Sequence, residues 1–314
     1  MSIQQKVLII HHWDTDGICS AAILMNKLSK YSKVENITTT LGMYWLSESE
    51  VENIAQKQYD VIIIVDVALD EESILLLKKK ACSTILYFDH HQRSLVKGIF
   101  FYNPIAEGDD PKLWPATSWV VAEFFNSPIE LWRVLGVIGD NEKRIVQNDK
   151  IFPVIEDYIK KSGINLDELL EMVQLLDSSY KVGDKEGVEQ AVSFIVNSGD
   201  ILQYKRFQSN VDKLEKEMKR WMESDSQMIN DIMIKEIHSS YSIISPLTRK
   251  LAWEGTGRLV IVINKGFFND KDQIYIRDGR NKVDLSPIIA MGIKEGFSIG
   301  GKKEVVGIVL PKDK

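Results

Sequence analysis

Three short and uninterrupted apolar runs, each ended abruptly by acidic or imidazole side chains, constrain the fold of this chain most strongly. They span 7–10, 61–65 and 84–88, and apolar residues at helical spacing follow the first run from Ile18 to Leu28. Uninterrupted apolar strands that alternate with helices are typical of a parallel sheet with both faces covered, so the sequence predicts an α/β fold. Ligands of such sheets bind beyond the carboxyl ends of the strands. We therefore expect the functional site where the three runs end.

The residues that follow these runs include most of the histidines in the chain. His11 and His12 follow the first run, Asp66 follows the second, and Asp89 to His91 follow the third. The chain holds five histidines, and four of them form two adjacent pairs that each lie near an aspartate. Structural histidines scattered through a fold would not group in this way. We interpret the grouping as a metal site rather than a polar cluster without a metal.

The candidate site is a set of carboxylates and imidazoles at the three strand ends and at one later position. Its members are His12, Asp14, Asp16, Asp66, Asp89, His90, His91 and Asp140. Carboxylate oxygens and imidazole nitrogens together suit Mn²⁺, with Mg²⁺, Co²⁺ or Zn²⁺ as alternatives. Because so many carboxylates would leave excess negative charge around a single cation, we expect two cations about 3.5–4 Å apart, the geometry of two-metal phosphoryl hydrolysis.

Composition excludes several other classes of protein. Of the 314 residues, 44% are hydrophobic and 27% are charged, which is typical of a globular protein rather than a disordered one. The two cysteines, Cys19 and Cys82, both have apolar sequence neighbours, so we expect reduced core thiols in a cytoplasmic protein instead of disulfides. No apolar run approaches the length of about 20 residues that a membrane span needs.

Charge is unevenly distributed along the chain. The net charge is −6, and residues 231–314 carry +4 while residues 1–230 carry −10. A protein that coats long nucleic acid without sequence preference usually has a basic surface, so this function is disfavoured. Bound cations would reverse the local field of the acidic part and allow it to accept phosphates.

The patterns along the chain predict two α/β domains joined by a helical connector. We place a catalytic domain with a parallel sheet at 1–185, the connector at 186–230 and a smaller substrate-binding domain at 231–314. A long helix over 201–223 has one apolar side and one side of mixed charge. We interpret the charged side as solvated, with a nucleic-acid-binding stripe as the alternative. In the last domain we expect strands at 259–263, 274–276 and 305–310, and a helix at 286–294.

Four motifs in the first half of the chain resemble those of the DHH phosphoesterase superfamily. In order, they are His12–Gly17, Asp66, Asp89–His91 and Gly139–Asn141, and the resemblance covers about 1–145. The superfamily includes RecJ-type exonucleases, nano-RNases, cyclic-dinucleotide phosphodiesterases and a class of inorganic pyrophosphatases. The first motif, His-x-Asp-x-Asp-Gly, is closer to RecJ-like members than to the longer-spaced loop of the pyrophosphatases.

The resemblance implies which residues hold the metals. The first Mn²⁺ is expected on His12, Asp14 and Asp66, and the second on Asp16, Asp66, His90 and Asp140, with Asp66 bridging the two. In this scheme a hydroxide between the two metals is the nucleophile that attacks phosphorus, because the cations lower the pKa of water toward neutrality.

The resemblance also implies that His91 and Asp89 act in catalysis. His91 would face the substrate and donate a hydrogen bond to a phosphoryl oxygen as negative charge builds there. Asp89 would orient an imidazole from behind. His11 is the rival of His12 as a metal ligand, but the spacing of the family's loop favours His12. We expect His11 to pack near the end of the strand.

The last part of the chain resembles the substrate domain that is associated with DHH domains. In that domain an arginine after a strand and a Gly-Gly-His loop grip the nucleotide. The matching residues here are Arg277, Gly300, Gly301 and Lys302. Arginine can clamp a phosphate with two hydrogen bonds, and glycines let backbone amides approach it. Lys302 stands at the histidine position, which keeps a cation but loses the ring and its neutral donor. Taken alone, the glycine pair would indicate only a tight turn.

Together these features predict an Mn²⁺-dependent phosphodiesterase that hydrolyses short oligonucleotides or (cyclic) dinucleotides. The main alternative is a RecJ-like exonuclease on single-stranded DNA or RNA, disfavoured by the acidic balance and by the lack of room for a further nucleic-acid-binding domain. A non-catalytic replication scaffold is disfavoured because every ligand position is filled. A pyrophosphatase is disfavoured because it would carry a different C-terminal domain. The sequence leaves open whether the protein forms a homodimer. Trp13 is interpreted as a packing residue, with a ring that stacks on a base as the alternative.

Overall fold

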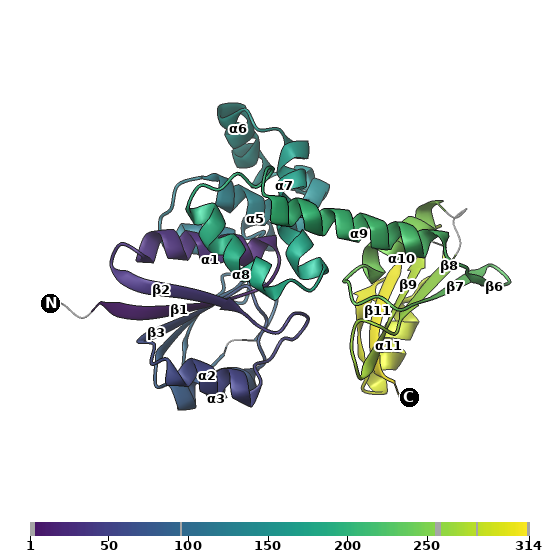
Figure 1. The fold of residues 1–314 in the computed structure, drawn as a ribbon, viewed down its shortest axis with the longest axis horizontal. Helices are drawn as coiled ribbons and strands as arrows, with labels where there is room; N and C mark the ends of the chain where they lie inside the picture. Colours follow the sequence, from purple (N-terminus) through teal and green to yellow (C-terminus); the bar gives the residue numbers. More distant parts are fainter. Residues whose placement is uncertain (1–3, 95, 255–258, 281, 313–314) are drawn as a thin grey trace. The chain divides into compact units, whose positions relative to one another are not determined.

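The chain forms two compact units (Figure 1). The structure is a computed structural model and describes residues 4–94, 96–254, 259–280 and 282–312. The first unit contains the residues up to Tyr180 together with Asp184–Gln208, and the second contains Lys181–Gly183 and the residues from Ser209 onward. None of the helices in these described ranges combines the length and apolarity that crossing a bilayer requires.

A five-stranded parallel sheet forms the centre of the first unit, with the strand order β2-β1-β3-β4-β5. The strands are β1 (Gln5–His11), β2 (Ser32–Thr38), β3 (Val61–Val65), β4 (Thr84–Phe88) and β5 (Phe100–Tyr102). β1 pairs with β3 in the register Val7↔Val61, and β3 pairs with β4 in the register Val61↔Thr84. The three apolar runs of the sequence are therefore adjacent strands that point the same way.

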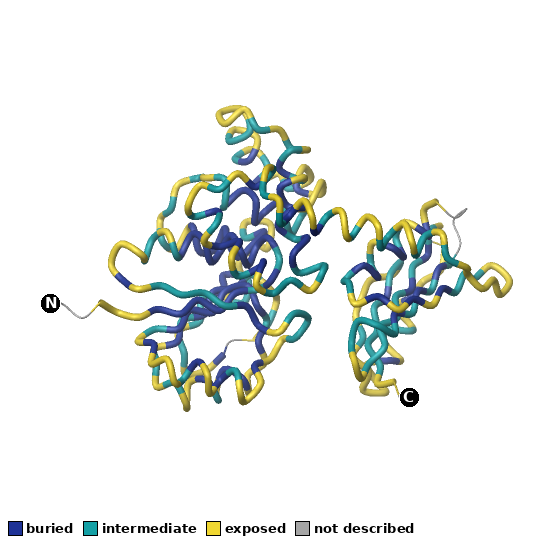
Figure 2. Tube along the Cα trace, viewed as in Figure 1, coloured by how far each residue is buried: buried dark blue, intermediate teal, exposed yellow. Residues whose placement is uncertain are grey.

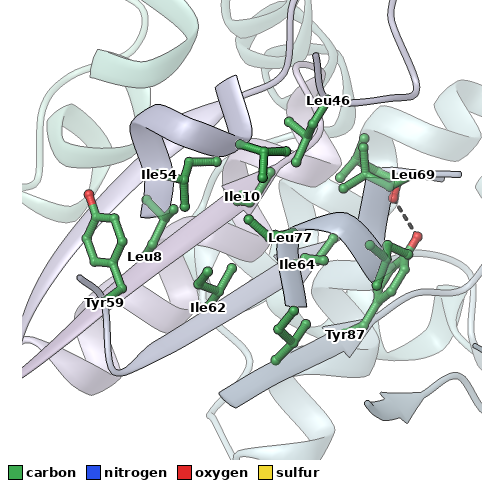
Figure 3. Packing of buried hydrophobic residues seen from close by; sticks show 14 of the residues in the cluster. Leu8, Ile10, Leu46, Ile54, Tyr59, Ile62, Ile64, Leu69, Leu77 and Tyr87 are labelled. Carbon is green, nitrogen blue, oxygen red and sulfur yellow. Dashed lines mark hydrogen bonds between the residues drawn. The ribbon is translucent and has the colours of Figure 1, made fainter. Parts of the chain in front are cut away.

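Helices α2 (Glu48–Gln56) and α3 (Glu71–Ala81) cover one face of this sheet. Side chains of β1, β3 and β4 pack against them in one buried cluster (Figure 3). Tyr87 closes the cluster, and its hydroxyl donates a 2.5 Å hydrogen bond to the backbone carbonyl of Val67. Each aliphatic side chain buried in this way stabilises the fold by about 1.5–3 kcal/mol. The packing fixes the strands side by side, and with them the loops at their carboxyl ends.

Helices α1 (Thr15–Leu28) and α5 (Leu131–Asn141) lie on the other face (Figure 1), and α4 (Thr117–Phe124) contacts both of them as well as β4. α1 contacts the sheet as well as α4, α5 and α8 (Lys185–Val196), and every residue of α1 from Thr15 to Leu24 is buried (Figure 2). A helix this deeply buried carries the polar residues of its first turn into the interior, where they need hydrogen-bond partners.

Helix α7 (Leu166–Lys181) supplies such a partner for the first residue of α1. The carboxylate of Asp177 accepts hydrogen bonds from the backbone amide of Thr15 (3.0 Å) and from its hydroxyl (2.7 Å). The start of α1 is thus tied to a residue 162 positions further along the chain. The remaining helices of this unit are η1 (Pro111–Leu113), η2 (Glu142–Gln147) and α6 (Phe152–Ser162).

A six-stranded mixed sheet forms the second unit, with the order β10-β11-β9-β8-β7-β6. The strands are β6 (Gln227–Ile229), β7 (Ile232–Ile237), β8 (Leu259–Asn264), β9 (Lys271–Asp278), β10 (Ser298–Lys302) and β11 (Val305–Pro311). The apolar side of α9 (Lys205–Glu223) packs with α10 (Ile244–Glu254) on a core around Val260 and Val262. Helix α11 (Ser286–Lys294) packs on a smaller core around Ile276 and Val306.

The structure differs from the sequence expectations at three points. The long helix begins at Lys205 rather than at 201. The strand β2 mixes polar and apolar residues, because it lies at the edge of the sheet, and its pattern does not predict a strand. Both cysteines are free thiols, and Cys19 is buried, but the expectation of a core thiol is wrong for Cys82. Cys82 ends α3 in the left-handed conformation (φ 52°), which leaves its side chain exposed.

Candidate metal centre

The candidate centre lies beyond the carboxyl ends of three adjacent strands. His12 follows β1, Asp66 follows β3 and Asp89 follows β4. The backbone continues the ladder of the sheet past the strands, because the amide of His12 donates to the carbonyl of Val65 (3.2 Å) and that of Asp66 to Phe88 (3.1 Å). These bonds bring the three segments to one edge of the sheet.

Asp66 occupies the middle of the centre in an uncommon backbone conformation. Its φ of 62° lies in the left-handed region, which few non-glycine residues adopt and which aspartate tolerates better than most. The carboxylate is buried, and its Oδ1 accepts a hydrogen bond from the hydroxyl of Thr117 (2.8 Å). Its Oδ2 has no hydrogen-bond partner among the described residues. One oxygen is therefore anchored, and the other is available to a ligand.

The loop from β1 into α1 supplies two further carboxylates. Asp14 caps α1, because its Oδ1 accepts from the backbone amide of Gly17 (3.1 Å). Asp16 is buried in the first turn, and its oxygens accept from the backbone amides of Thr117 (2.6 Å) and Ser118 (3.0 Å). The N-terminus of α4 thus holds Asp16 in place with two charge-assisted hydrogen bonds.

Two imidazoles lie on either side of Asp66. Nδ1 of His12 lies 2.8 Å from Oδ2 of Asp14 and 3.7 Å from Oδ2 of Asp66. Nε2 of His90 lies 2.9 Å from Oδ2 of Asp140, near the end of α5, and 3.8 Å from Oδ1 of Asp66. Each oxygen of Asp66 therefore lies within 4 Å of a different histidine, and each of these histidines is paired with another aspartate.

Three sets of residues each bring their potential ligand atoms within 4.8 Å of one another. They are His12 with Asp14 and Asp66, Asp16 with His90 and Asp140, and Asp66 with His90 and His91. The first two sets contain six of the residues singled out in the sequence. The third set makes His91 a potential ligand as well as a potential substrate contact.

The unpaired atoms of this centre show that the donor set fits divalent cations. Nδ1 of His12, Nε2 of His90 and Oδ2 of Asp66 are buried without a hydrogen-bond partner among the described residues. Each histidine nitrogen lies close to a carboxylate oxygen but without the angles of a hydrogen bond. A separation of about 3 Å is that of neighbouring ligands in octahedral coordination. Buried polar atoms left unpaired are rare, and a cation would satisfy all three.

Burial and like charge dominate the electrostatics of the centre. Burial, followed by the nearby Asp16 and Asp14 carboxylates, raises the pKa of Asp66 well above its ordinary value. Burial raises the pKa of Asp140 to about 6. Burial lowers the pKa of His90, but the Asp140 carboxylate outweighs this effect, and the pKa rises to about 9. In the absence of cations the cluster therefore retains protons, which cations would displace.

Asp89 and His91 form a pair beside the centre. Asp89 is buried, and its Oδ1 accepts from the backbone amides of His90 (2.8 Å) and His91 (3.2 Å). The same oxygen lies 2.8 Å from Nδ1 of His91. Burial raises the pKa of Asp89, but the hydrogen bond from His91 outweighs burial and lowers it overall. The His91 side chain is 49% exposed, so a ring oriented by a buried carboxylate faces solvent.

His11 is buried beside β2 and both of its ring nitrogens are engaged. Its Nδ1 lies 2.7 Å from the carbonyl oxygen of His12, and its Nε2 lies 3.1 Å from Nδ2 of Asn36. Burial lowers the pKa of His11 to about 4, so the ring is neutral at pH 7. A histidine with both nitrogens occupied by protein groups is a packing residue, which supports His12 as the ligand of the pair.

Aromatic rings flank the His12 side of the centre. Trp13 is buried. The centroid of its ring lies 4.2 Å from the centroid of the His12 ring and 5.2 Å from that of the Tyr44 ring. Trp13 is thus placed as a packing residue. Tyr44 is 46% exposed, and its ring is stacked against His12 with 6.0 Å between the centroids. Tyr44 was not singled out in the sequence, because no local pattern connects residue 44 with the metal loop.

Thr117 and Ser118 were also missed in the sequence. Their backbone amides, at the N-terminus of α4, hold Asp16 from about a hundred residues further along the chain. Asn103 similarly donates from Nδ2 to the backbone carbonyl of His91 (2.8 Å). The sequence around Thr117 and Ser118 indicates only that a helix begins there. It does not show that this helix start binds Asp16, because that contact depends on tertiary packing.

The four candidate substrate-binding residues lie in the second unit. Arg277 is in β9, and Gly300, Gly301 and Lys302 are in β10. β11 lies between these strands, and its residue Val305 pairs with both Arg277 and Lys302. Arg277, Val305 and Lys302 therefore form a row across three strands with their side chains on one face. Gly301 has a φ of 152°, and a Cβ there would lie 2.1 Å from the carbonyl oxygen of Val305, so this position requires glycine.

Comparisons with known proteins find one family match, in the first part of the chain. Residues 6–151 match the DHH family, N-terminal domain. This segment contains every candidate metal ligand and extends from β1 to the end of η2. No curated protein matches the chain.

Solved structures share the fold over nearly the whole chain. An exonuclease RecJ bound to manganese has a TM-score of 0.61 at 15% identity, covering 98% of this chain and 86% of the other. RecJ from Thermus thermophilus in complex with Mn²⁺ has a TM-score of 0.63 at 14% identity, but this chain spans only 50% of that protein. PggH from Vibrio cholerae, a pGpG-specific phosphodiesterase, gives 0.51 at 14% identity, covering 98% and 94% of the two chains.

Proposed function

We propose that this chain, whose residues 6–151 match the DHH family, N-terminal domain, is a metal-dependent phosphodiesterase that hydrolyses short oligonucleotides or (cyclic) dinucleotides. The observation that carries the proposal is that Asp66 lies within 4 Å of a histidine of both the His12–Asp14 and the His90–Asp140 pair, with three buried atoms that find no hydrogen-bond partner among the described residues. Such a donor set suits two divalent cations and the hydrolysis of a phosphate ester.

The proposed ligands divide between two cations that share Asp66. His12, Asp14 and Asp66 would hold one, and Asp16, Asp66, His90 and Asp140 would hold the other. Mn²⁺ is the proposed metal, with Mg²⁺ or Co²⁺ as alternatives, because the ligands are imidazoles and carboxylates. When bound, the cations supply a nucleophile at neutral pH and stabilise negative charge on the phosphoryl group.

The remaining proposed steps belong to the side chains of the protein. His91, oriented by Asp89, would donate a hydrogen bond to a phosphoryl oxygen, and this bond would strengthen as negative charge accumulates. Thr117 would keep Asp66 in its bridging position, and the amide groups of α4 would hold Asp16. In the second unit, Arg277 and Lys302 would bind substrate phosphates, and Gly300 and Gly301 would let backbone amides approach them.

Two observations support a small substrate. The net charge of −6 is unsuited to a tight grip on long strands, because binding to long nucleic acid depends on many phosphate contacts. PggH, which has nearly the same length and fold, is a pGpG-specific phosphodiesterase. The competing candidate is a RecJ-like exonuclease, which the fold likeness to RecJ and the +4 charge of residues 231–314 favour. The fit of the donor set to cations disfavours a non-catalytic scaffold.

The test compares substrates of different length at equal phosphodiester concentration in the presence of Mn²⁺. The substrates are pGpG, a cyclic dinucleotide and an end-labelled long single strand. We expect rapid cleavage of at least one small substrate while the long strand remains nearly intact. Stepwise shortening of the long strand from one end would instead identify an exonuclease, and the label would give its polarity.

Asp66→Asn is the control for metal dependence in the same assay. The change removes the charge of the proposed bridging ligand but keeps its shape and its backbone. We expect loss of activity towards every substrate together with a lower content of bound Mn²⁺. Full activity in Asp66→Asn would contradict a mechanism that uses two cations.

A further inference from the structure

A second candidate site lies at the opposite end of α1 from the metal centre. A cavity of about 210 Å³ opens between the last turn of α1 and the segment that leads from α4 into α5. Lys27 and Lys30 line it from the α1 side, and Ser127, Trp132 and Arg133 line it from the other. At 1.5 Å per residue, the helix separates Lys27 from Asp16 by about 16 Å. The cavity is therefore not part of the metal centre.

The floor of the cavity contains a buried cation with unused hydrogen-bonding capacity. Arg133 is 3% exposed, and its guanidinium lies over the ring of Trp119, 3.6 Å from the centroid. One of its terminal nitrogens donates to the carbonyl oxygen of Ser127 (3.2 Å), and another pairs with Glu123. Its Nε has no hydrogen-bond partner among the described residues. The hydroxyl of Ser127 is likewise buried and unpaired in this part of the chain.

Two lysines add positive charge at the rim. Within the described ranges, neither Lys27 nor Lys30 forms an ion pair with a carboxylate of the chain. Glu130 is the acidic residue in the lining, and it is exposed to solvent. Lys27, Lys30 and Arg133 outnumber Glu130 and the Glu123 that pairs with Arg133, so the cavity keeps a net positive charge although the whole unit is acidic. Unpaired buried donors and positive charge around one cavity are the features of an anion site.

We propose that this cavity binds the phosphate group of a small phosphate monoester, with Lys27 and Lys30 at its entrance and Arg133 and Ser127 at its floor. A tetrahedral dianion offers several acceptor oxygens, enough for both lysines and for the unpaired donors below them. Ile23 and Trp132 line the same cavity and provide apolar surface for the organic part of the ligand. The site is independent of the proposed catalytic function, because it contains none of the candidate metal ligands.

The test is calorimetric titration of the full-length protein after removal of metals with EDTA. The probes are inorganic phosphate and adenosine 5′-monophosphate. The proposed substrate contacts Arg277 and Lys302 are unchanged in every variant, so the part of the binding that is lost in a cavity variant reports on the cavity. We expect saturable binding of at least one probe, and at least a tenfold loss of affinity in the double variant Lys27→Gln/Lys30→Gln. Ser127→Ala should weaken binding by a smaller factor, since it removes one neutral donor.

The matched control is the double variant Lys160→Gln/Lys161→Gln, which removes the same charge from two exposed lysines of α6. It should bind the probes like the unmodified protein. The proposal is overturned by absence of binding at millimolar probe, or by equal affinities in the two double variants. Neither result depends on catalytic turnover, so the outcome leaves the proposed phosphodiesterase activity to its own assay.

Discussion

Thr117 donates its hydroxyl to Oδ1 of Asp66 (2.8 Å), while its backbone amide donates to Oδ2 of Asp16 (2.6 Å). One residue at the start of α4 thereby positions two carboxylates that come from different strand ends. Oδ2 of Asp66 has no hydrogen-bond partner in the part of the chain that the structure describes, and it lies 3.7 Å from Nδ1 of His12.

The first prediction concerns this hydroxyl. Thr117→Val keeps the shape and the backbone amide but removes the hydrogen bond that orients Asp66. We expect a 10–100-fold loss of Mn²⁺ affinity, as is typical when a group behind a metal ligand is removed. Calorimetric titration with Mn²⁺ measures the change, and Thr117→Ser should restore most of the affinity. An unchanged affinity in Thr117→Val would show that Asp66 does not depend on this bond.

The second prediction separates the roles of the two adjacent histidines. His91→Ala should keep both cations and lose about 10²–10⁴-fold in kcat, because it removes a donor to the developing charge. His90→Ala should instead lose bound metal, because His90 belongs to the Asp16–His90–Asp140 set. Metal content by elemental analysis and kcat are measured on the same samples. Loss of metal in His91→Ala would make His91 a ligand, as its proximity to Asp66 and His90 permits.

The third prediction uses a close approach of α5 to the centre. A Cβ on Gly136 would lie 2.1 Å from Oγ of Ser118, 2.5 Å from Oδ1 of Asp16 and 2.6 Å from Cβ of Ser118. Gly136→Ala should therefore lower the free energy of unfolding by about 1–3 kcal/mol, the usual cost of overpacking, and weaken Mn²⁺ binding. Urea denaturation measures the first effect. Because Ser118→Ala removes the shortest of these three contacts and keeps the one with Cβ, it should recover part of the loss in the double variant. Purely additive effects would argue against this packing.

The fourth prediction concerns the row of cations in the second unit. Lys302→Ala should raise KM for a dinucleotide more than it lowers kcat, because the proposed contact holds a phosphate away from the cleaved bond. The neighbouring Lys303→Ala is the matched control, since Lys303 lies outside the strand β10 that pairs with Val305. Steady-state kinetics on pGpG provide both constants. Equal KM values in the two variants would remove Lys302 from the substrate site.

The fifth prediction is a dependence of stability on pH. The hydrogen bond from Tyr59 to Glu35 (2.7 Å) is the main cause that lowers the pKa of Glu35 to about 2, from its ordinary value of 4.5. Glu35 therefore adds stability above pH 4.5, and this contribution is lost as pH falls toward 2. Tyr59→Phe should cost about 1 kcal/mol at pH 7, a modest figure because solvent screens the partly exposed carboxylate.

The cost of Tyr59→Phe should shrink when unfolding is measured again near pH 3. The control is the Glu35→Gln background, in which Tyr59→Phe should have a cost that does not change with pH. A constant cost of Tyr59→Phe in the unmodified background would show that Glu35 does not titrate through this bond.

The positions of the strand ends could be predicted from sequence because the strands of a parallel sheet all end at the same edge. Continuous apolar runs indicate strands covered on both faces, and the polar residues that follow them gather at one edge of the sheet. The edge strand β2 could not be identified in this way, since its residues Glu35 and Asn36 contact groups outside the core. Thr117 and Tyr44 could not be found either, because they reach the centre through tertiary packing and no local period marks them.

The hydrogen bonds from Thr15 to Asp177 affect where this protein can be truncated. The segment that matches the DHH family ends at residue 151, whereas Asp177 belongs to a helix beyond it. A fragment cut at residue 151 would retain every candidate metal ligand. It would lose Asp177, which accepts hydrogen bonds from the amide and the hydroxyl of Thr15. Thr15 begins α1, which Asp14 caps and which contains Asp16. We therefore expect a fragment that extends to the end of α8, which also contacts α1, to hold the start of α1 better than one cut at the family boundary.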